Sequence, residues 1–392
     1  MAFIDPSPLL DLPGVRPVLA ALPGSRIVGG AVRDLLADRP VSDVDVATPT
    51  PPEQVVERLK AAGLRAIPTG IAHGTVTALA EGGAVEVTTL RQDVETDGRH
   101  AVVAFTEDFA VDAARRDFTI NAMSLGPDGT LYDYFGGAND LAAGRLRFVG
   151  TPAGRIAEDY LRILRFFRFH LRYGREAPDG ETAAALAAAA PQLTTLSAER
   201  VWLETGKILS VADPRPELTL MAELGVFQVL LPEAAADWPA RMDRLADVRA
   251  PEDPVLRLAA LIAEPAAADR VARRLKLSNA ERERLAALLA DPLPAPEASD
   301  VVLRQVAAES PIPILIGRSF LRHPAGEMAA AFRGRLAGMD PPVFPLQGRD
   351  GVALGVKPGP ALGRALREVR DWWIARGCLD DADACRAELA RV

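Results

Sequence analysis

The sequence predicts an α+β protein, with a small mixed sheet and its helices in the first 150 residues and helices alone in the rest. Two observations lead to this division. Before residue 150, short runs with a period of two, such as 75–79 and 84–89, alternate with helical segments, which indicates strands and helices in one domain. After residue 150 the pattern is helical throughout, with short breaks marked by proline.

Length, composition and charge are those of a folded protein with more than one domain. The chain has 392 residues, of which 25% are charged and 49% are hydrophobic. Neither the first residues nor the alanine-rich segment 183–190 has the pattern of a signal peptide or the length of a membrane span, so we expect a cytoplasmic protein without membrane contact. The net charge of −8 argues against broad, sequence-independent RNA binding, but it is compatible with a local basic groove.

The first structural signal is a glycine turn at residues 27–34, with the sequence Ile-Val-Gly-Gly-Ala-Val-Arg-Asp. Gly29 and Gly30 have no Cβ atom, so their backbone N–H groups can approach a phosphate closely. The helix that opens at residue 31 points its positive dipole end to the same place, and Arg33 adds a cation one turn later. A Gly-Gly pair alone is more often only a turn, so the phosphate-binding interpretation needs support from other residues of the chain.

A second strand comes after the glycine turn and carries two carboxylates, Asp43 and Asp45. Because side chains alternate along a strand, residues two apart lie on one face and can share divalent cations. An isolated Asp-x-Asp is more often part of a solvated loop. Together with the glycine turn and Arg33, however, the pair predicts metal-assisted nucleotidyl transfer.

The segment up to residue 109 continues the predicted sheet. A helix to about residue 63 and further strands are expected before residue 90. Glu86 lies on the last of these strands. Two interpretations of this residue stay open, namely a third metal-binding carboxylate and a solvent-facing glutamate. Residues 91–109 are polar and predict a mobile loop or a loose hairpin.

The block at 115–122, Arg-Arg-Asp-Phe-Thr-Ile-Asn-Ala, places arginines beside a carboxylate. We expect it to open a short helix. The guanidinium group of Arg116 is a forked donor suited to phosphate, and Asp117 is an acceptor that a ribose hydroxyl could use. An ordinary capped helix with exposed arginines is the alternative for this segment taken alone.

A third block lies on a long helix expected from 154 to 173. Asp159 and Arg162 are three residues apart, so they are neighbours on one face of that helix, and Arg165 extends the row. An intrahelical salt bridge on a surface helix is the alternative, and such pairs are common.

These three blocks occur together in the order found in one known family. The chain resembles the class II CCA tRNA nucleotidyltransferase and bacterial poly(A) polymerase family of the polymerase-β superfamily, strongly over residues 20–240 and loosely beyond. The resemblance implies a polymerase-β-like catalytic head (1–150), a neck that reads the nucleotide base (151–212), a helical body (213–290) and a helical tail that contacts tRNA (291–392).

The resemblance also implies a role for each candidate residue. Asp43 and Asp45 would be the catalytic, metal-binding residues, with Mg²⁺ as the cofactor and Mn²⁺ as the alternative. The nucleotide-binding residues would be Gly29, Gly30, Arg33, Arg116, Asp117, Asp159, Arg162 and Arg165. Among these, Asp117 would contact the ribose, and Asp159, Arg162 and Arg165 would recognise the base.

The predicted function is therefore template-independent transfer of CMP and AMP from CTP and ATP to the tRNA 3′ end by a two-metal mechanism. One alternative keeps the chemistry but changes the product, with addition of A only or poly(A) tailing. Another class of alternative is an RNA-binding module with a vestigial active site, against which the intact aspartate pair argues. The sequence leaves the oligomeric state open.

Overall fold

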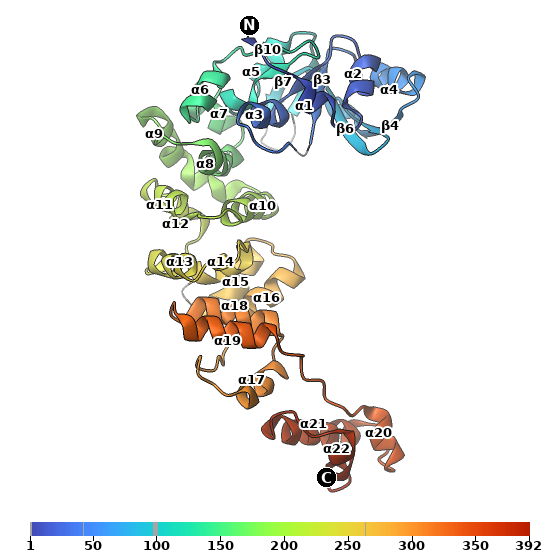
Figure 1. Cartoon of the computed structure of the whole chain (residues 1–392). Helices are drawn as coiled ribbons and strands as arrows, with labels where there is room; N and C mark the ends of the chain where they lie inside the picture. The colour runs from blue at the N-terminus through green and yellow to red at the C-terminus, as the bar shows by residue number, and fades with distance from the viewer. Residues whose placement is uncertain (1, 42, 97–100, 263) are drawn as a thin grey trace. The chain divides into compact units, whose positions relative to one another are not determined.

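The computed structural model describes residues 2–41, 43–96, 101–262 and 264–392 (Figure 1). The contacts within the chain divide it into two compact units. Unit 1 comprises Met1–Ile208 and Pro216–Pro232, and unit 2 comprises Leu209–Arg215 and Glu233–Val392. Within the described residues, no helix is both long enough and apolar enough to cross a membrane.

The N-terminal part of unit 1 contains a mixed sheet with the strand order β1-β10-β9-β2-β3-β6-β5-β4. Its strands are β1 (Ala2–Phe3), β2 (Arg26–Val28), β3 (Asp45–Thr48), β4 (Arg65–Gly70), β5 (Thr75–Ala80), β6 (Gly83–Thr89), β9 (Ser124–Leu125) and β10 (Thr130–Tyr132). Strands β3 and β6 are parallel, and the other neighbouring pairs are antiparallel. The predicted mixed sheet is therefore confirmed.

Alternation of apolar and polar residues explains how β6 forms. Val85 and Val87 are buried, whereas Glu86 between them is exposed, as expected of a strand with one face on the core. The predicted loop or hairpin after it contains a two-stranded antiparallel sheet, β7 (Arg91–Thr96) and β8 (Ala101–Phe105). Residues 97–100 of that segment lie outside the described residues.

Helices surround this sheet and continue through the rest of unit 1. They are α1 (Ser7–Leu10), α2 (Val15–Ala21), α3 (Gly30–Leu36), α4 (Pro52–Ala61), α5 (Phe109–Ala114), α6 (Gly137–Ala143), α7 (Pro152–Glu158), α8 (Leu161–Tyr173), α9 (Gly180–Ala189), α10 (Ala198–Leu209), α11 (Arg215–Glu223) and α12 (Val226–Leu230), with the 3₁₀ turns η1 (Ile71–His73), η2 (Thr119–Asn121) and η3 (Ala190–Thr195). The predicted short helix in the 115–122 block is only the 3₁₀ turn η2, because helix α5 ends before the block begins.

The prediction of one long helix from 154 to 173 is wrong, because the chain breaks at Asp159 between α7 and α8. Asp159 is extended, with φ −156° and ψ 107°. Its carboxylate accepts a hydrogen bond from the Leu161 N–H at 3.1 Å, so the side chain competes with the helix for a backbone donor.

Aromatic packing fixes α8 against the 115–122 block and the segment before α7. The Phe118 ring lies 4.8 Å from Phe148 and 5.4 Å from Phe169, measured between centroids. Phe166 stacks on Phe148 at 5.8 Å. These rings are buried and hold α8 in one position beside the sheet, which matters because α8 carries two of the predicted site residues.

The regular elements in the described residues of unit 2 are helices, as predicted for the C-terminal part, and one isolated β-bridge joins Ala234 and Ile262. Its elements are α13 (Trp238–Asp247), α14 (Pro254–Leu261), η4 (Pro265–Ala267), α15 (Ala268–Arg274), α16 (Asn279–Leu289), α17 (Asp300–Ala307), α18 (Ile312–Arg322), α19 (Glu327–Ala337), α20 (Gly348–Ala353), α21 (Pro360–Ala375) and α22 (Ala382–Leu389). Leu315 and Phe332 belong to one buried cluster, and Val369 and Trp373 belong to another.

Candidate active site

Strand register places the predicted carboxylates beside the glycine turn. Asp45 pairs with Val28, the last residue of β2, and on the other side with Glu86 of β6. Asp43 precedes β3, and it is exposed like Asp45, while Val44 between them is buried. Asp43, Asp45 and Glu86 therefore lie at one end of the sheet, next to Gly29.

The carboxylates at this end of the sheet repel one another. Although Asp45 is exposed, the protein atoms around its carboxylate displace part of its hydration and raise its pKa above the ordinary value. The negative charges of Glu86 and Asp43 raise this pKa further, while Arg116 acts in the opposite direction. A cation among these oxygens would relieve that repulsion. Among the described residues, however, no three His, Cys, Asp or Glu side chains form a group that could hold a metal ion by themselves.

Gly29 is required by two features of the glycine turn. Its φ of 67° lies in the left-handed region, which L-residues with side chains rarely adopt. A Cβ atom there would also lie 2.9 Å from Nη1 of Arg116, so the absent side chain makes room for this guanidinium group. A Cβ atom at Gly30 would meet Arg33 at 3.5 Å, which is ordinary contact.

Buried acceptors orient the arginines of the glycine turn and of the 115–122 block. Arg33 donates to both oxygens of Asp34, at 3.1 and 2.9 Å, and to Oδ1 of Asn121 at 2.6 Å. Asp112 pairs with Arg115 at 2.8 Å and with Arg116 at 3.2 Å. These guanidinium groups are therefore held in place before any ligand arrives.

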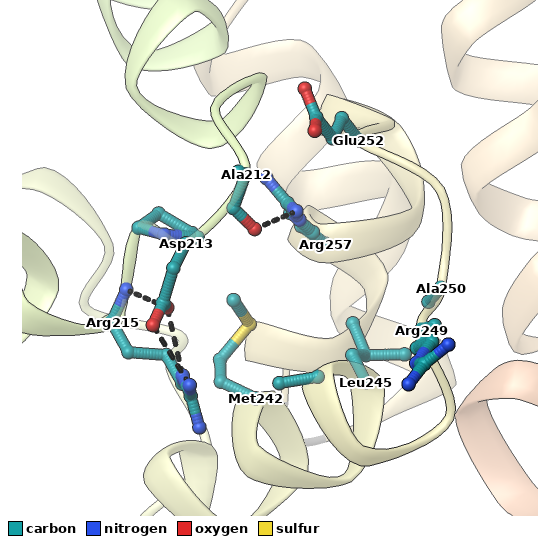
Figure 2. Close-up of a pocket in the computed structure, with 11 residues that line it drawn as sticks. Ala212, Asp213, Arg215, Met242, Leu245, Arg249, Ala250, Glu252 and Arg257 are labelled. Atoms are coloured by element: carbon teal, nitrogen blue, oxygen red, sulfur yellow. Dashed lines mark hydrogen bonds and ion pairs between the residues drawn. The ribbon is translucent and has the colours of Figure 1, made fainter. Parts of the chain in front are cut away.

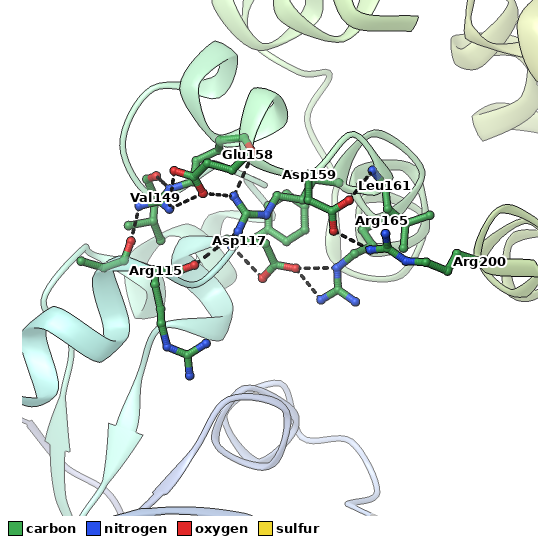
Figure 3. A network of polar contacts seen from close by, with 12 residues as sticks. Arg115, Asp117, Val149, Glu158, Asp159, Leu161, Arg165 and Arg200 are labelled. Carbon is green, nitrogen blue, oxygen red and sulfur yellow. Dashed lines mark hydrogen bonds and ion pairs between the residues drawn. The ribbon is translucent and has the colours of Figure 1, made fainter. Parts of the chain in front are cut away.

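Asp117 joins the 115–122 block to α8 (Figure 3). Its Oδ2 accepts from Arg165 Nε at 2.8 Å and from Nη2 at 2.5 Å, while Oδ1 accepts from Asn121 at 3.0 Å. Burial disfavours the charge on Asp117, but Arg165 and the hydrogen bonds from Asn121 and Phe118 outweigh it and hold its pKa below the ordinary value.

Asp159 and Arg162 are not partners of each other, so the alternative of an intrahelical salt bridge between them is excluded. Asp159 pairs with Arg200 of α10 at 2.7 Å. Arg162 pairs with Glu158 at 2.5 Å and also donates to the Arg155 carbonyl at 2.8 Å. The break before α8 separates the two side chains into different ion pairs, as Figure 3 shows for Asp159.

Helix α10 contacts both α8 and the residue before it through ion pairs. Arg200 reaches Asp159, and Glu204 of the same helix pairs with Arg168 of α8 at 2.6 Å. Because Glu204 is almost fully buried, the loss of Arg168 would leave its charge with the more distant Lys207 alone, at 3.4 Å. We therefore consider α10 part of the support of the site.

These residues enclose a cavity of about 610 Å³ in unit 1, called the central cavity below. It is lined by Gly29, Gly30, Arg33, Asp45, Arg91, Arg115, Arg116, Asp117, Asn121, Asp159, Leu161, Arg162, Arg165, Phe169 and Arg200. Every predicted site residue except Asp43 is among them. Seven guanidinium groups face three carboxylates, so the cavity favours an anionic ligand.

Sequence reasoning missed three arginines of the central cavity as site residues, namely Arg91, Arg115 and Arg200. Arg91 comes from the start of β7, and nothing in the local sequence distinguishes it from other polar residues there. Arg200 comes from α10, and its position opposite Asp159 depends on tertiary packing. Glu86 was left undecided, and its register with Asp45 is the signal that sequence alone lacks.

A histidine on α8 gives this part of unit 1 a pH dependence. His170 Nδ1 lies 3.0 Å from Glu217 Oε2, and Nε2 lies 2.8 Å from the Glu176 carbonyl. Burial disfavours the imidazolium, but the hydrogen bond and charge of Glu217, together with that carbonyl, raise the pKa of His170 above its ordinary 6.5. The folded chain thus holds this proton more tightly than the unfolded chain does.

We therefore expect stability to fall as the pH rises from 6.5 through the folded pKa of His170, because the stabilisation is complete only below the unfolded value. Chemical denaturation at several pH values measures this slope. His170→Gln should flatten it, whereas His73→Gln, which changes an exposed histidine, should not. Equal slopes in the wild type and in His170→Gln would contradict the assignment.

Unit 2 contains a separate, smaller cavity of about 260 Å³ (Figure 2). Two of its arginines already have partners. Arg257 donates to the Leu209, Val211 and Ala212 carbonyls, which end and follow α10, and Arg215 pairs with Asp213 and Asp243 at 2.8 Å each. The cavity contains none of the predicted site residues, so we assign the chemistry to the central cavity.

Family models match two parts of the chain. Residues 25–147 match the poly A polymerase head domain, and residues 177–237 match the domain described as "Probable RNA and SrmB- binding site of polymerase A". The first match covers the glycine turn, both aspartates and the 115–122 block. The second begins after α8 and covers α9 to α12.

Named relatives and a solved structure match most of the chain. The CCA tRNA nucleotidyltransferase 1, mitochondrial, of Danio rerio is 39% identical over 89% of this chain and 83% of its own length. The human protein of the same name is 38% identical over 90% and 83%. A crystal structure of the Bacillus stearothermophilus CCA-adding enzyme with CTP is 30% identical, covers 94% of this chain and 92% of its own, and has a TM-score of 0.75.

Proposed function

Since this chain belongs to the CCA tRNA nucleotidyltransferase family, we propose that it transfers CMP and AMP from CTP and ATP to the 3′ end of tRNA, and that it does so in the central cavity. One observation carries the placement. The predicted residues come from three separate blocks between residues 29 and 165, and all but Asp43 line the same cavity. The solved relative with 30% identity is a complex with CTP.

We propose that Asp43 and Asp45 hold the divalent cation that nucleotidyltransferases of this family use, with Mg²⁺ as the ion and Mn²⁺ as the alternative. The donor set fits such an ion, because exposed carboxylate oxygens that repel one another lie beside the glycine turn. Bound there, the ion would lower the pKa of the primer 3′-hydroxyl and offset charge on the phosphates. Too few protein ligands converge among the described residues to enclose it, which suits an ion that also takes phosphate and water oxygens.

The triphosphate would lie against the glycine turn. Gly29 keeps the backbone open there, and the guanidinium groups of Arg116 and Arg33 lie beside Gly29 and Gly30. Both guanidinium groups are oriented by Asp34, Asn121 and Asp112, so their donors need little rearrangement when a phosphate arrives.

Asp159, Arg162 and Arg165 would read the base. Cytosine and adenine both carry an exocyclic amine on the pairing edge, which a carboxylate accepts, and both have a ring nitrogen acceptor to which arginine can donate. Guanine and uracil present the opposite pattern. Arg200 holds the Asp159 carboxylate toward the cavity, so we add it to this group as a positioning residue. Asp117 would meet the ribose while Arg165 and Asn121 keep it ionised and in place.

We also propose that Glu86 supports the cation site from β6. It lies directly beside Asp45 in the parallel β3–β6 pair and contributes to the raised pKa of Asp45. Glu86→Gln should slow transfer by about 10- to 100-fold and raise the concentration of divalent ion needed for half-maximal rate. The control Glu81→Gln changes an exposed glutamate before β6 and should have no effect. An unchanged requirement for the ion in Glu86→Gln would show that Glu86 takes no part.

The proposed function is tested with three tRNA transcripts that end at the discriminator base, at C and at CC. Each transcript is incubated with the full chain, Mg²⁺ and CTP, ATP or both, and the products are sized on a sequencing gel. Addition of two C residues and then one A, with no further growth, supports CCA addition. One A added only to the CC transcript indicates an A-adding enzyme, and a long A ladder on any RNA indicates a poly(A) polymerase. No addition at all would leave only the RNA-binding alternative.

Three expectations stay predictions. The first is the four-part division into head, neck, body and tail, because contacts separate the chain into two units only. The second is a cytoplasmic location, since relatives with mitochondrial names match the chain well. Contact of the tail with tRNA is the third.

A further inference from the structure

Unit 1 has a second large cavity, called the helix-end cavity below, where α3 and α8 end beside α6. Its volume is about 630 Å³, close to that of the central cavity, and the two share no lining residue. It is lined by Leu36, Ala37, Asp38, Arg39, Ala138, Leu141, Ala142, Arg172, Tyr173, Gly174 and Arg175. Both α3 and α8 begin at the central cavity, so the two cavities lie at opposite ends of the same two helices.

Three guanidinium groups line the helix-end cavity without a carboxylate partner. In the part of the chain that the structure describes, none of Arg39, Arg172 and Arg175 forms an ion pair. Arg39 donates to the Arg172 carbonyl at 2.7 Å, which is a neutral acceptor. The arginines of the central cavity differ, because Arg33 and Arg165 are each paired with an aspartate.

A count of charges leaves this cavity positive. Three arginines contribute three positive charges, and Asp38 is the acidic residue in the lining. The C-terminal ends of α3 and α8 each add roughly half a negative charge. About one positive charge therefore stays uncompensated, in a chain whose net charge is −8. Unpaired guanidinium groups around a hollow favour an anion there, and their forked donors match phosphate oxygens.

Arg39, Arg172 and Arg175 are exposed to solvent, but part of each side chain contacts a neighbouring residue. The stem of Arg175 lies so close to Gly144 that a Cβ atom there would be 2.6 Å from Cβ and Cγ of Arg175. The guanidinium carbons of Arg39 and Arg172 lie 4.9 and 5.5 Å from the centre of the buried Tyr173 ring. These contacts restrict the side chains in part, which lowers the conformational entropy that they lose when they bind a ligand.

We propose that the helix-end cavity binds a phosphate group, supplied either by the RNA backbone or by a small phosphate compound. A short chain of hydrogen bonds also connects the helix-end cavity with the central cavity. The Tyr173 hydroxyl donates to Asp34, and Asp34 in turn orients Arg33 of the glycine turn. The phosphate site itself does not depend on the proposed function, whereas an RNA source for the phosphate does.

The test uses the full chain and the double variant Arg39→Gln/Arg172→Gln. The matched control is Arg58→Gln/Arg65→Gln, which removes two exposed arginines that line neither cavity and form no ion pair among the described residues. Thermal unfolding confirms that each variant is folded. Binding of a tRNA transcript ending in CC is measured at several salt concentrations, and binding of inorganic pyrophosphate is measured by calorimetry.

If the phosphate comes from RNA, the slope of log K against log salt should become shallower by about 0.7 to 0.9 in the double variant, as the loss of one phosphate contact predicts, and stay unchanged in the control. If it comes from a small compound, the slope stays the same, and the double variant loses one of two pyrophosphate sites. The inference is overturned if the double variant matches the control in both measurements. Neither measurement needs turnover, so failure here is distinct from a failure of nucleotide transfer.

Discussion

Asp45→Ala should slow nucleotide transfer by about a thousandfold while tRNA affinity stays nearly unchanged. The variant removes the carboxylate that β3 places next to the glycine turn, and with it the main protein ligand of the proposed cation. Loss of several kcal/mol of charge stabilisation in the transition state corresponds to roughly this factor. Single-turnover extension of a transcript ending in CC, with ATP in excess, measures the rate.

The matched control for this experiment is Asp11→Ala, because Asp11 is an exposed aspartate of unit 1 that pairs with Arg16 on the surface and does not line the central cavity. It should transfer nucleotides at the wild-type rate. A near-normal rate of nucleotide transfer by Asp45→Ala would contradict the assignment of the metal site. A loss of tRNA binding equal to the loss of rate would instead indicate a folding defect.

Asp159→Ala should relax the choice of base. The variant removes the acceptor for the exocyclic amine and frees Arg200, so C and A lose their advantage over U and G. A hydrogen bond to a charged group contributes about 1.5–3 kcal/mol, so discrimination between CTP and UTP should fall by roughly 10- to 100-fold. The ratio of kcat/KM for the two nucleotides, measured on a transcript ending at the discriminator base, gives this quantity.

Arg145→Ala is the control for base choice, because Arg145 lies outside the central cavity and its partner Asp140 keeps Arg147. It should leave the CTP to UTP ratio as in the wild type. A ratio that is also unchanged in Asp159→Ala would mean that another group reads the base. An equal decrease in kcat/KM for all four nucleotides would instead indicate that α8 is displaced.

Much of this site is predictable because its residues are close in sequence. Gly29, Gly30 and Arg33 share one turn, and the period of a strand is sufficient to relate Asp43 to Asp45. The residues that sequence reasoning missed or left undecided depend on pairings between distant segments. The register of β3 with β6 brings Glu86 to Asp45, and only the fold brings Arg200 to Asp159 across 41 residues.

The break at Asp159 shows that a side-chain hydrogen bond can interrupt a helix that the sequence pattern predicts. Residues 154–173 have a continuous helical pattern, so propensity predicts one helix. The Asp159 carboxylate instead accepts the Leu161 N–H and pairs with Arg200, and these two interactions stabilise an extended residue between α7 and α8. The interruption turns Asp159 away from Arg162 and toward α10. Asp159 was predicted to lie on one face of a helix beside Arg162. It instead lines the cavity from the boundary between two helices.

The most direct test of this account is a pair of crystal structures of the Asp45→Asn variant of the full chain, one with CTP and one with ATP. We predict that both nucleotides occupy the central cavity, with the triphosphate against Gly29, Gly30 and Arg33. The exocyclic amine of each base should lie within hydrogen-bonding distance of Asp159, and Arg162 should donate to the same edge. A triphosphate elsewhere, or a base held without contact to Asp159 and Arg162, would contradict the claim that one cavity selects both nucleotides.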